Sequence, residues 1–151
     1  MEISTKIVIG NDHAAIELKK AILQYLQDKD GVCVEDCGAN DSTKADYPDY
    51  AWDVCSKVLS GEFDRALLLC GTGAGMCMAA NKVQGIRAVV CSDPYTAKLS
   101  REHNDANILC IGARVVGSEL AKTIVDAFIT AEFEGGRHQL RVDKIMAIEK
   151  A

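Results

Sequence analysis

A chain of 151 residues is long enough for one domain with a sizeable core, and 48% hydrophobic with 26% charged residues are typical of a globular protein. The formal net charge of −5 argues against nucleic acid or an anionic membrane as a partner, because both attract a basic face. No apolar run approaches the roughly 20 residues of a membrane span, and the N-terminus lacks the features of a leader. We therefore expect a single domain over residues 1–151, located in the cytoplasm.

The seven cysteines argue against two further classes of protein. Their number is odd, their spacing is irregular and no C-x-x-C pair occurs, so neither a disulfide framework nor a zinc site is predicted. Several of them lie inside apolar runs, where a free cysteine packs as a small hydrophobic residue. We expect reduced thiols and no metal.

Short apolar runs alternate with helical patterns along the chain. In the first helical pattern Leu18, Ile22 and Leu26 share one face, which places Lys19 on the outer face. Strands that alternate with helices indicate βαβ units, and right-handed crossovers then place helices on both faces of a parallel sheet. The runs expected to form its five strands are 6–10, 32–34, 66–69, 87–91 and 107–111.

Polar residues follow several of these strands directly. Asp12 and His13 follow the first strand, Cys70 to Gly75 follow the third, and Arg114 follows the fifth. In parallel sheets ligands bind outside the carboxyl ends of the strands, so we expect these residues to converge on one edge. Asp93 follows the fourth strand and precedes Pro94, which predicts a helix cap.

The stretch Cys70-Gly71-Thr72-Gly73-Ala74-Gly75 joins the third strand to a helix and is predicted to be the reactive centre. Its glycines allow backbone N–H groups to approach a ligand, and the helix N-terminus adds partial positive charge. The same charge favours a thiolate at Cys70, which serves as a nucleophile or as a base. Thr72 has two possible roles, to contact a substrate oxygen or tune the thiol, or to cap the helix.

A nucleotide site is disfavoured at this loop. Gly71-x-Gly73-x-Gly75 is one residue short of the dinucleotide fingerprint, and no G-K-[ST] follows. Asp93 lies at the distance of a ribose-binding acid, but its role as a helix cap explains it better.

The histidines and the last helix leave alternatives open. His13, beside Asp12, and His103, in a polar break, are each as compatible with a surface role as with chemistry, whereas His138 is expected to point to solvent. Arg137 and Arg141 share one face of a helix that begins near Arg137, which fits either a phosphate grip or a solvated basic face. Because this helix is partly apolar, we expect it to pack on a neighbouring subunit.

Seven ordered sequence blocks extend along almost the whole chain: Gly10-Asn11-Asp12-His13, Asp46-Tyr47-Pro48, Cys70-Gly71-Thr72-Gly73, Ala79-Ala80-Asn81-Lys82, Gly85-Ile86-Arg87-Ala88, Ser100-Arg101-Glu102-His103-Asn104-Asp105 and Glu134-Gly135-Gly136-Arg137-His138. Together they resemble the type B ribose-5-phosphate isomerases, which belong with the galactose-6-phosphate and allose-6-phosphate isomerases. The resemblance implies an α/β fold, a Rossmann-like three-layer sandwich, and a homodimer with two shared active sites that often pairs into a tetramer. It also implies no metal or organic cofactor.

The resemblance also implies roles for individual residues. Cys70 resembles the general base that moves a proton between C2 and C1 through a cis-enediolate, with assistance from Thr72. His103 resembles the acid and base that opens the furanose ring. The backbone N–H groups expected to form the anion hole belong to Gly71, Gly73, Ala74 and Gly75.

The remaining implied contacts surround the sugar. Asp12 and His13 are expected near the ring oxygen and hydroxyls, and Asn104 near a hydroxyl or the enediolate. Tyr47 is expected in a loop at the dimer site. The resemblance assigns phosphate binding to Arg114, Arg137 and Arg141.

The expected function is therefore that of an aldose–ketose isomerase that interconverts ribose 5-phosphate and ribulose 5-phosphate in the pentose phosphate pathway. A six-carbon sugar phosphate is an alternative substrate, because the depth of the pocket cannot be read from the sequence. A nucleotide- or flavin-binding regulatory module on the same topology is a third interpretation. The missing fingerprint and the cysteine in the loop argue against it.

Overall fold

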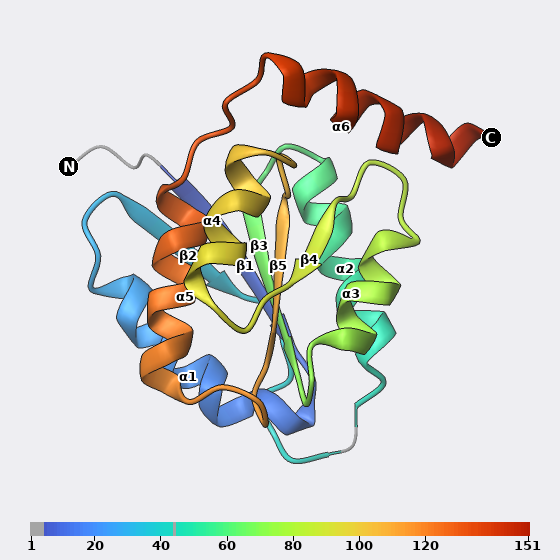
Figure 1. Cartoon of the computed structure of the whole chain (residues 1–151). Coiled ribbons are helices and arrows are strands. Elements are labelled where there is room, and N and C mark those ends of the chain that lie inside the picture. Colours follow the sequence, from blue (N-terminus) through green and yellow to red (C-terminus); the bar gives the residue numbers. More distant parts are fainter. Residues whose placement is uncertain (1–4, 44) are drawn as a thin grey trace.

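The computed structural model describes residues 5–43 and 45–151, which form one five-stranded sheet between two helical layers (Figure 1). Its strand order is β2-β1-β3-β5-β4, and every neighbouring pair is parallel. The five-stranded parallel sheet expected from the sequence is therefore confirmed. The strands are β1 (Thr5–Asn11), β2 (Val32–Asp36), β3 (Arg65–Cys70), β4 (Ala88–Val90) and β5 (Ile108–Gly112).

Helices cover both faces of the sheet, as right-handed crossovers require. The faces differ in their helices because successive strand residues point to opposite sides. In β3, Leu67 and Leu69 pack with α1, α4 and α5, whereas Ala66 and Leu68 pack with α2 and α3. The helices are α1 (Ile16–Gln27), α2 (Tyr47–Leu59), α3 (Ala74–Asn81), α4 (Pro94–Glu102), α5 (Ser118–Thr130) and α6 (Arg137–Ala147), with short 3₁₀ segments η1 (His13–Ala15) and η2 (Ile148–Lys150).

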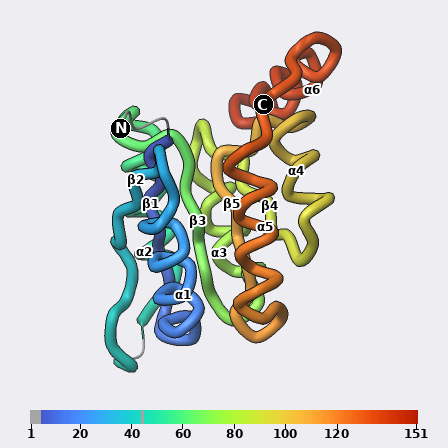
Figure 2. The backbone as a smooth tube through the Cα atoms, turned by 90° about the vertical axis from the view of Figure 1, so that its left-hand side faces the viewer, coloured from blue at the N-terminus to red at the C-terminus, as the bar shows by residue number. Residues whose placement is uncertain are grey.

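The last helix, α6, stands outside this sandwich. Figures 1 and 2 both show it beyond the edge of the sheet where α4 ends, away from the edge where α1 and α3 begin. Its start near Arg137 confirms the sequence prediction. Three large apolar residues of the α6–η2 segment are exposed to solvent, namely Leu140, Ile145 and Ile148.

The expectation that the N-terminus lacks the features of a leader rests partly on residues 1–4, which lie outside the described residues. Within the described part of the chain, no helix is long and apolar enough to cross a membrane.

Lys19 was predicted to lie on the outer face of α1, and this prediction is wrong. The side chain is 1% exposed, and its Nζ donates a 2.6 Å hydrogen bond to the carbonyl of Ala39 and another to Asn40 Oδ1. The same ammonium lies 3.1 Å from Asp36 Oδ2. A buried ammonium needs such a set of oxygens because it loses its water. Lys19 therefore anchors the segment after β2 onto α1.

We predict that Lys19→Met destabilises the fold by about 2 kcal/mol, because Asp36 loses its cationic partner while remaining only partly solvated. Urea unfolding measures this change. The double variant Lys19→Met/Asp36→Asn should recover part of the loss, since it leaves no unpaired charge. A double variant less stable than Lys19→Met would contradict this account.

Candidate active site

Cys70 is the last residue of β3 and lies at the edge of the sheet where the strands end. Its side chain is 5% exposed, and its Sγ accepts the backbone N–H of Gly73 at 3.2 Å. The sulfur therefore lies beside a backbone N–H donor and the N-terminus of α3, at the edge of the sheet where ligands bind in parallel folds.

Gly73 is required by the turn that forms this contact. It precedes α3 with φ +84°, a conformation that side chains rarely adopt. A Cβ atom at this position would lie 2.9 Å from Val90 Cγ2 and 3.1 Å from the carbonyl carbon of Ile111. Thr72 Oγ1 accepts the N–H of Ala74 at 3.2 Å and so contributes a hydrogen bond at the start of α3, whose cap residue is Gly73.

Arg114 lies beside the same loop. Its backbone N–H donates to the carbonyl of Gly71 at 3.0 Å, and its guanidinium covers Gly71, where a Cβ would lie 3.2 Å from Nη1.

Tyr47 was expected in a loop, but it is the first residue of α2. Its ring packs against Gly75, where a Cβ atom would lie 2.7 Å from the ring carbons.

Asp12 and His13 complete this group, as the sequence predicted. The N–H of Asp12 donates to the carbonyl of Leu69 at 3.2 Å, which fixes the end of β1 beside the end of β3. The Asp12 carboxylate accepts the N–H of Ala14 at 3.0 Å and caps η1. A cavity of about 520 Å³ opens here, lined by Asp12, His13, Ala45, Asp46, Tyr47, Pro48 and Asp49.

His13 is held in one tautomer by a backbone contact. Its Nδ1 accepts the N–H of Ala45 at 3.1 Å, so a neutral imidazole carries its proton on Nε2. Ala45 belongs to the segment after β2 that Lys19 anchors on α1.

Asp93 is a helix cap, as predicted. Its carboxylate accepts the backbone N–H and the hydroxyl of Thr96, both at 2.7 Å. The backbone N–H of Thr96 is the largest cause of a lowered pKa at Asp93.

A second cluster of candidate residues lies around the end of α4. His103 follows this helix, and its ring stacks on His138 with centroids 4.2 Å apart and an interplanar angle of 10°. His138 was expected to point to solvent, but it is 8% exposed, because the first turn of α6 packs against the end of α4. Glu134 Oε1 lies 3.6 Å from His103 Nε2 and 3.5 Å from His138 Nε2.

Basic groups surround this pair of rings. Arg137 and Arg141 are exposed on α6, and they are close enough to affect His138. Burial, then His103, and then the two arginines lower the pKa of His138, although Glu134 opposes them. Glu134 begins one of the sequence blocks that carry the resemblance, but the sequence analysis gave it no role; its spacing of four residues from His138 was a further signal.

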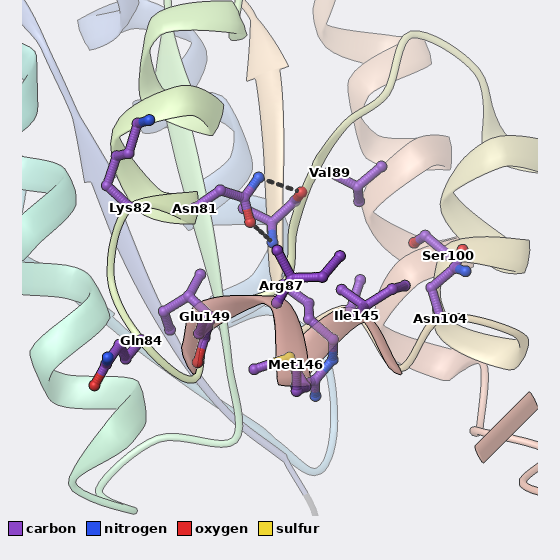
Figure 3. A pocket seen from close by; sticks show the side chains of 14 residues that line it. Asn81, Lys82, Gln84, Arg87, Val89, Ser100, Asn104, Ile145, Met146 and Glu149 are labelled. Carbon is purple, nitrogen blue, oxygen red and sulfur yellow. Dashed lines mark hydrogen bonds between the residues drawn. The ribbon is translucent and has the colours of Figure 1, made fainter. Parts of the chain in front are cut away.

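Asn104 lies beside a cavity of about 680 Å³ between β4 and the α6–η2 segment (Figure 3). In Figure 3 Ser100 and Asn104 lie at the right with Ile145 beside them, Met146 lies below the centre, and Lys82 and Gln84 lie at the left. The Asn81 amide donates to the carbonyl of Ala88 at 2.9 Å and accepts the N–H of Ala88 at 2.8 Å. These two hydrogen bonds satisfy backbone groups on the open side of edge strand β4.

The two clusters lie at opposite edges of the sheet. Asn107 precedes β5, so His103 and Asn104 lie where the strands begin, whereas Cys70 lies where β3 ends. The six residues of β3 place these edges about 16 Å apart at 3.3 Å per residue. One chain therefore brings Cys70 together with Asp12, His13 and Arg114. It does not bring Cys70 together with the second cluster, which comprises His103, Asn104, Arg137 and Arg141.

Comparison with known proteins identifies close relatives. A family model described as Ribose/Galactose Isomerase matches residues 7–145. Ribose-5-phosphate isomerase B of Escherichia coli (strain K12) is 55% identical over 145 residues, which cover 96% of this chain and 97% of that protein. The structure of the Clostridium thermocellum ribose-5-phosphate isomerase B superposes with a TM-score of 0.93 at 54% identity, covering 96% and 97% of the two chains. That of the Mycoplasma genitalium enzyme with bound ribulose-5-phosphate has a TM-score of 0.92 at 45% identity, covering 99% of each chain.

Gly73 and Gly61 offer a matched pair of variants, because both have a positive φ but only Gly73 has close neighbours. We predict that Gly73→Ala destabilises the fold by about 3 kcal/mol, because strain at positive φ adds to overpacking against β4 and β5. Gly61 has the same φ of +84° but no atom within 4 Å of an added Cβ, so Gly61→Ala should cost only about 1 kcal/mol. Urea unfolding measures the loss in free energy of unfolding for each variant. Equal losses would show that the close approach to Val90 and Ile111 is unimportant.

Proposed function

The chain belongs to the ribose/galactose isomerase family, and on this premise we propose that it is an aldose–ketose isomerase that interconverts ribose 5-phosphate and ribulose 5-phosphate. The observation that carries the proposal is Cys70, placed at the end of β3 under a glycine turn that donates an N–H to its sulfur. The relative solved with ribulose-5-phosphate supports a pentose phosphate as the substrate. We assign the reaction to the pentose phosphate pathway in the cytoplasm.

The proposed reaction moves one proton between adjacent carbons. The Cys70 thiolate takes the proton from C2 of the open-chain aldose, and negative charge develops on the carbonyl oxygen at C1. We assign the N–H groups of Gly71, Gly73, Ala74 and Gly75 to this oxygen of the cis-enediolate, with Thr72 beside them. The N–H groups of Gly73 and Ala74 must leave Cys70 Sγ and Thr72 Oγ1 to reach it. Return of the proton from Cys70 to C1 and transfer of the hydroxyl proton from the oxygen at C2 to the oxygen at C1 complete the ketose.

His13 and Asp12 bind the sugar in this proposal. The Nε2–H of His13 donates to a sugar oxygen, because its Nδ1 is already occupied by Ala45. Tyr47 borders the same cavity. Binding energy from groups remote from C1 and C2 orients the reacting carbons.

We propose that each complete active site combines two copies of the chain in a homodimer. One copy supplies the Cys70 loop and Arg114, and the other supplies His103 for ring opening and Asn104 for a hydroxyl. Arg137 and Arg141 of the second copy then hold the phosphate together with Arg114. The separation of the two clusters in one chain supports this arrangement, as do the exposed apolar residues Leu140, Ile145 and Ile148.

Purified protein should convert ribose 5-phosphate to ribulose 5-phosphate, and Cys70→Ala should lower kcat by at least about 1,000-fold because the base is lost. Cys33→Ala, a half-buried thiol on β2, is the matched control and should retain full activity. Circular dichroism checks that both variants fold. Faster conversion of allose 6-phosphate or galactose 6-phosphate would indicate a six-carbon substrate, and full activity of Cys70→Ala would reject the assigned base.

The shared site predicts complementation between two inactive variants. Cys70→Ala and His103→Asn homodimers each lack one essential group in both sites. After unfolding together and refolding at equal concentrations, half of the dimers are mixed, and each has one intact site, so about a quarter of wild-type activity should return. If each chain carried a complete site, mixing would restore nothing.

A further inference from the structure

His103, Glu134 and His138 place three metal-binding side chains together. One ligand atom from each lies within 4.8 Å of the others, and this is the one such group of His, Cys, Asp or Glu side chains among residues 5–43 and 45–151. The two segments that carry them are fixed to each other, because the N–H of Glu134 donates to the carbonyl of Glu102 at 3.0 Å. His103 itself is fixed by its N–H, which donates to the carbonyl of Leu99 at 2.9 Å.

The spacing of these atoms matches that of a tetrahedral zinc site. Bonds of 2.0–2.1 Å to a central ion place neighbouring ligand atoms about 3.4 Å apart. Glu134 Oε1 lies 3.6 Å from His103 Nε2 and 3.5 Å from His138 Nε2. Two imidazoles and one carboxylate suit Zn²⁺ better than Mg²⁺ or Ca²⁺, which prefer oxygen ligands only.

We propose that His103, Glu134 and His138 form a binding site for a divalent transition metal, Zn²⁺ above all, with water as the fourth ligand. The side chains of Glu134 and His103 are 52% and 36% exposed, so an ion and its water have access from solvent. The isomerisation proposed above does not use this metal.

Two features of the site keep the affinity below that of a structural zinc site. A metal lies in the plane of each imidazole that binds it, so the stacked rings must turn apart. His103 has the exposure needed to turn, whereas His138 is enclosed. Arg137 and Arg141 on α6 oppose a cation, and Glu134 compensates for only one of them. We expect dissociation constants in the micromolar range.

The consequence for catalysis rests on the proposed function. A metal on Nε2 of His103 occupies the lone pair that ring opening requires, and it lies beside the arginines assigned to the phosphate. The bound ion therefore inhibits the enzyme and competes with the sugar phosphate. Zinc at a free concentration well above its dissociation constant should abolish conversion of ribose 5-phosphate at low substrate concentration, and EDTA should restore it. Full activity in the zinc-loaded protein would overturn the inhibitory role.

Cobalt titration of tag-free protein tests the site without substrate. Co²⁺ should bind once per chain, with visible d–d absorption and no sulfur-to-cobalt charge-transfer band, and Zn²⁺ should displace it. This spectrum separates the proposed ligands from the seven cysteines, which bind zinc as well. Glu134→Gln and His138→Gln should each weaken binding at least about 10-fold, as loss of a ligand does.

Glu132→Gln is the matched control, because it removes an exposed carboxylate two residues away on the same segment and should leave cobalt binding unchanged. Unchanged binding in Glu134→Gln, or a thiolate spectrum in the wild-type protein, would overturn the site. Because binding is measured without substrate, an inactive protein that binds cobalt would refute the proposed function and leave the metal site standing.

Discussion

The parallel direction of all five strands is the constraint on which the chemistry of this protein depends. Each strand ends at one edge of the sheet, and each following helix returns the chain to the other edge. Cys70 ends a strand, whereas His103 ends a helix, so the topology separates them by the length of β3. The buried core on both faces of the sheet resists any deformation that would bring them together. A site that uses both residues therefore requires two chains.

The features that could be predicted from the sequence depend on neighbours along the chain. Apolar runs identified the strands, and the glycines after Cys70 identified the turn into α3. Asp93 followed by Pro94 identified a helix start. Each of these signals is local, because a strand end, a positive φ and a helix cap are determined by a few consecutive residues.

The features that were mispredicted depend on segments far apart in the sequence. Lys19 is buried because oxygens of Asp36, Ala39 and Asn40 replace its water, and no pattern within α1 reports them. His138 is buried because α6 packs on the end of α4. The candidate site is likewise divided between two edges of the sheet, because α4 returns the chain to the edge where the strands begin. A short sequence motif does not report the direction in which its helix runs.

In the two proposals, the cluster around His103 binds an anion and a cation through different properties of the same side chains. Two arginines against one carboxylate leave its charge positive when both imidazoles are neutral, so long-range electrostatics favour a phosphate. Zinc is repelled at long range, but it gains direct bonds to two imidazole nitrogens and a carboxylate oxygen once the rings turn. Screening by salt weakens the first effect far more than the second. Rising ionic strength should therefore shift the competition toward the metal.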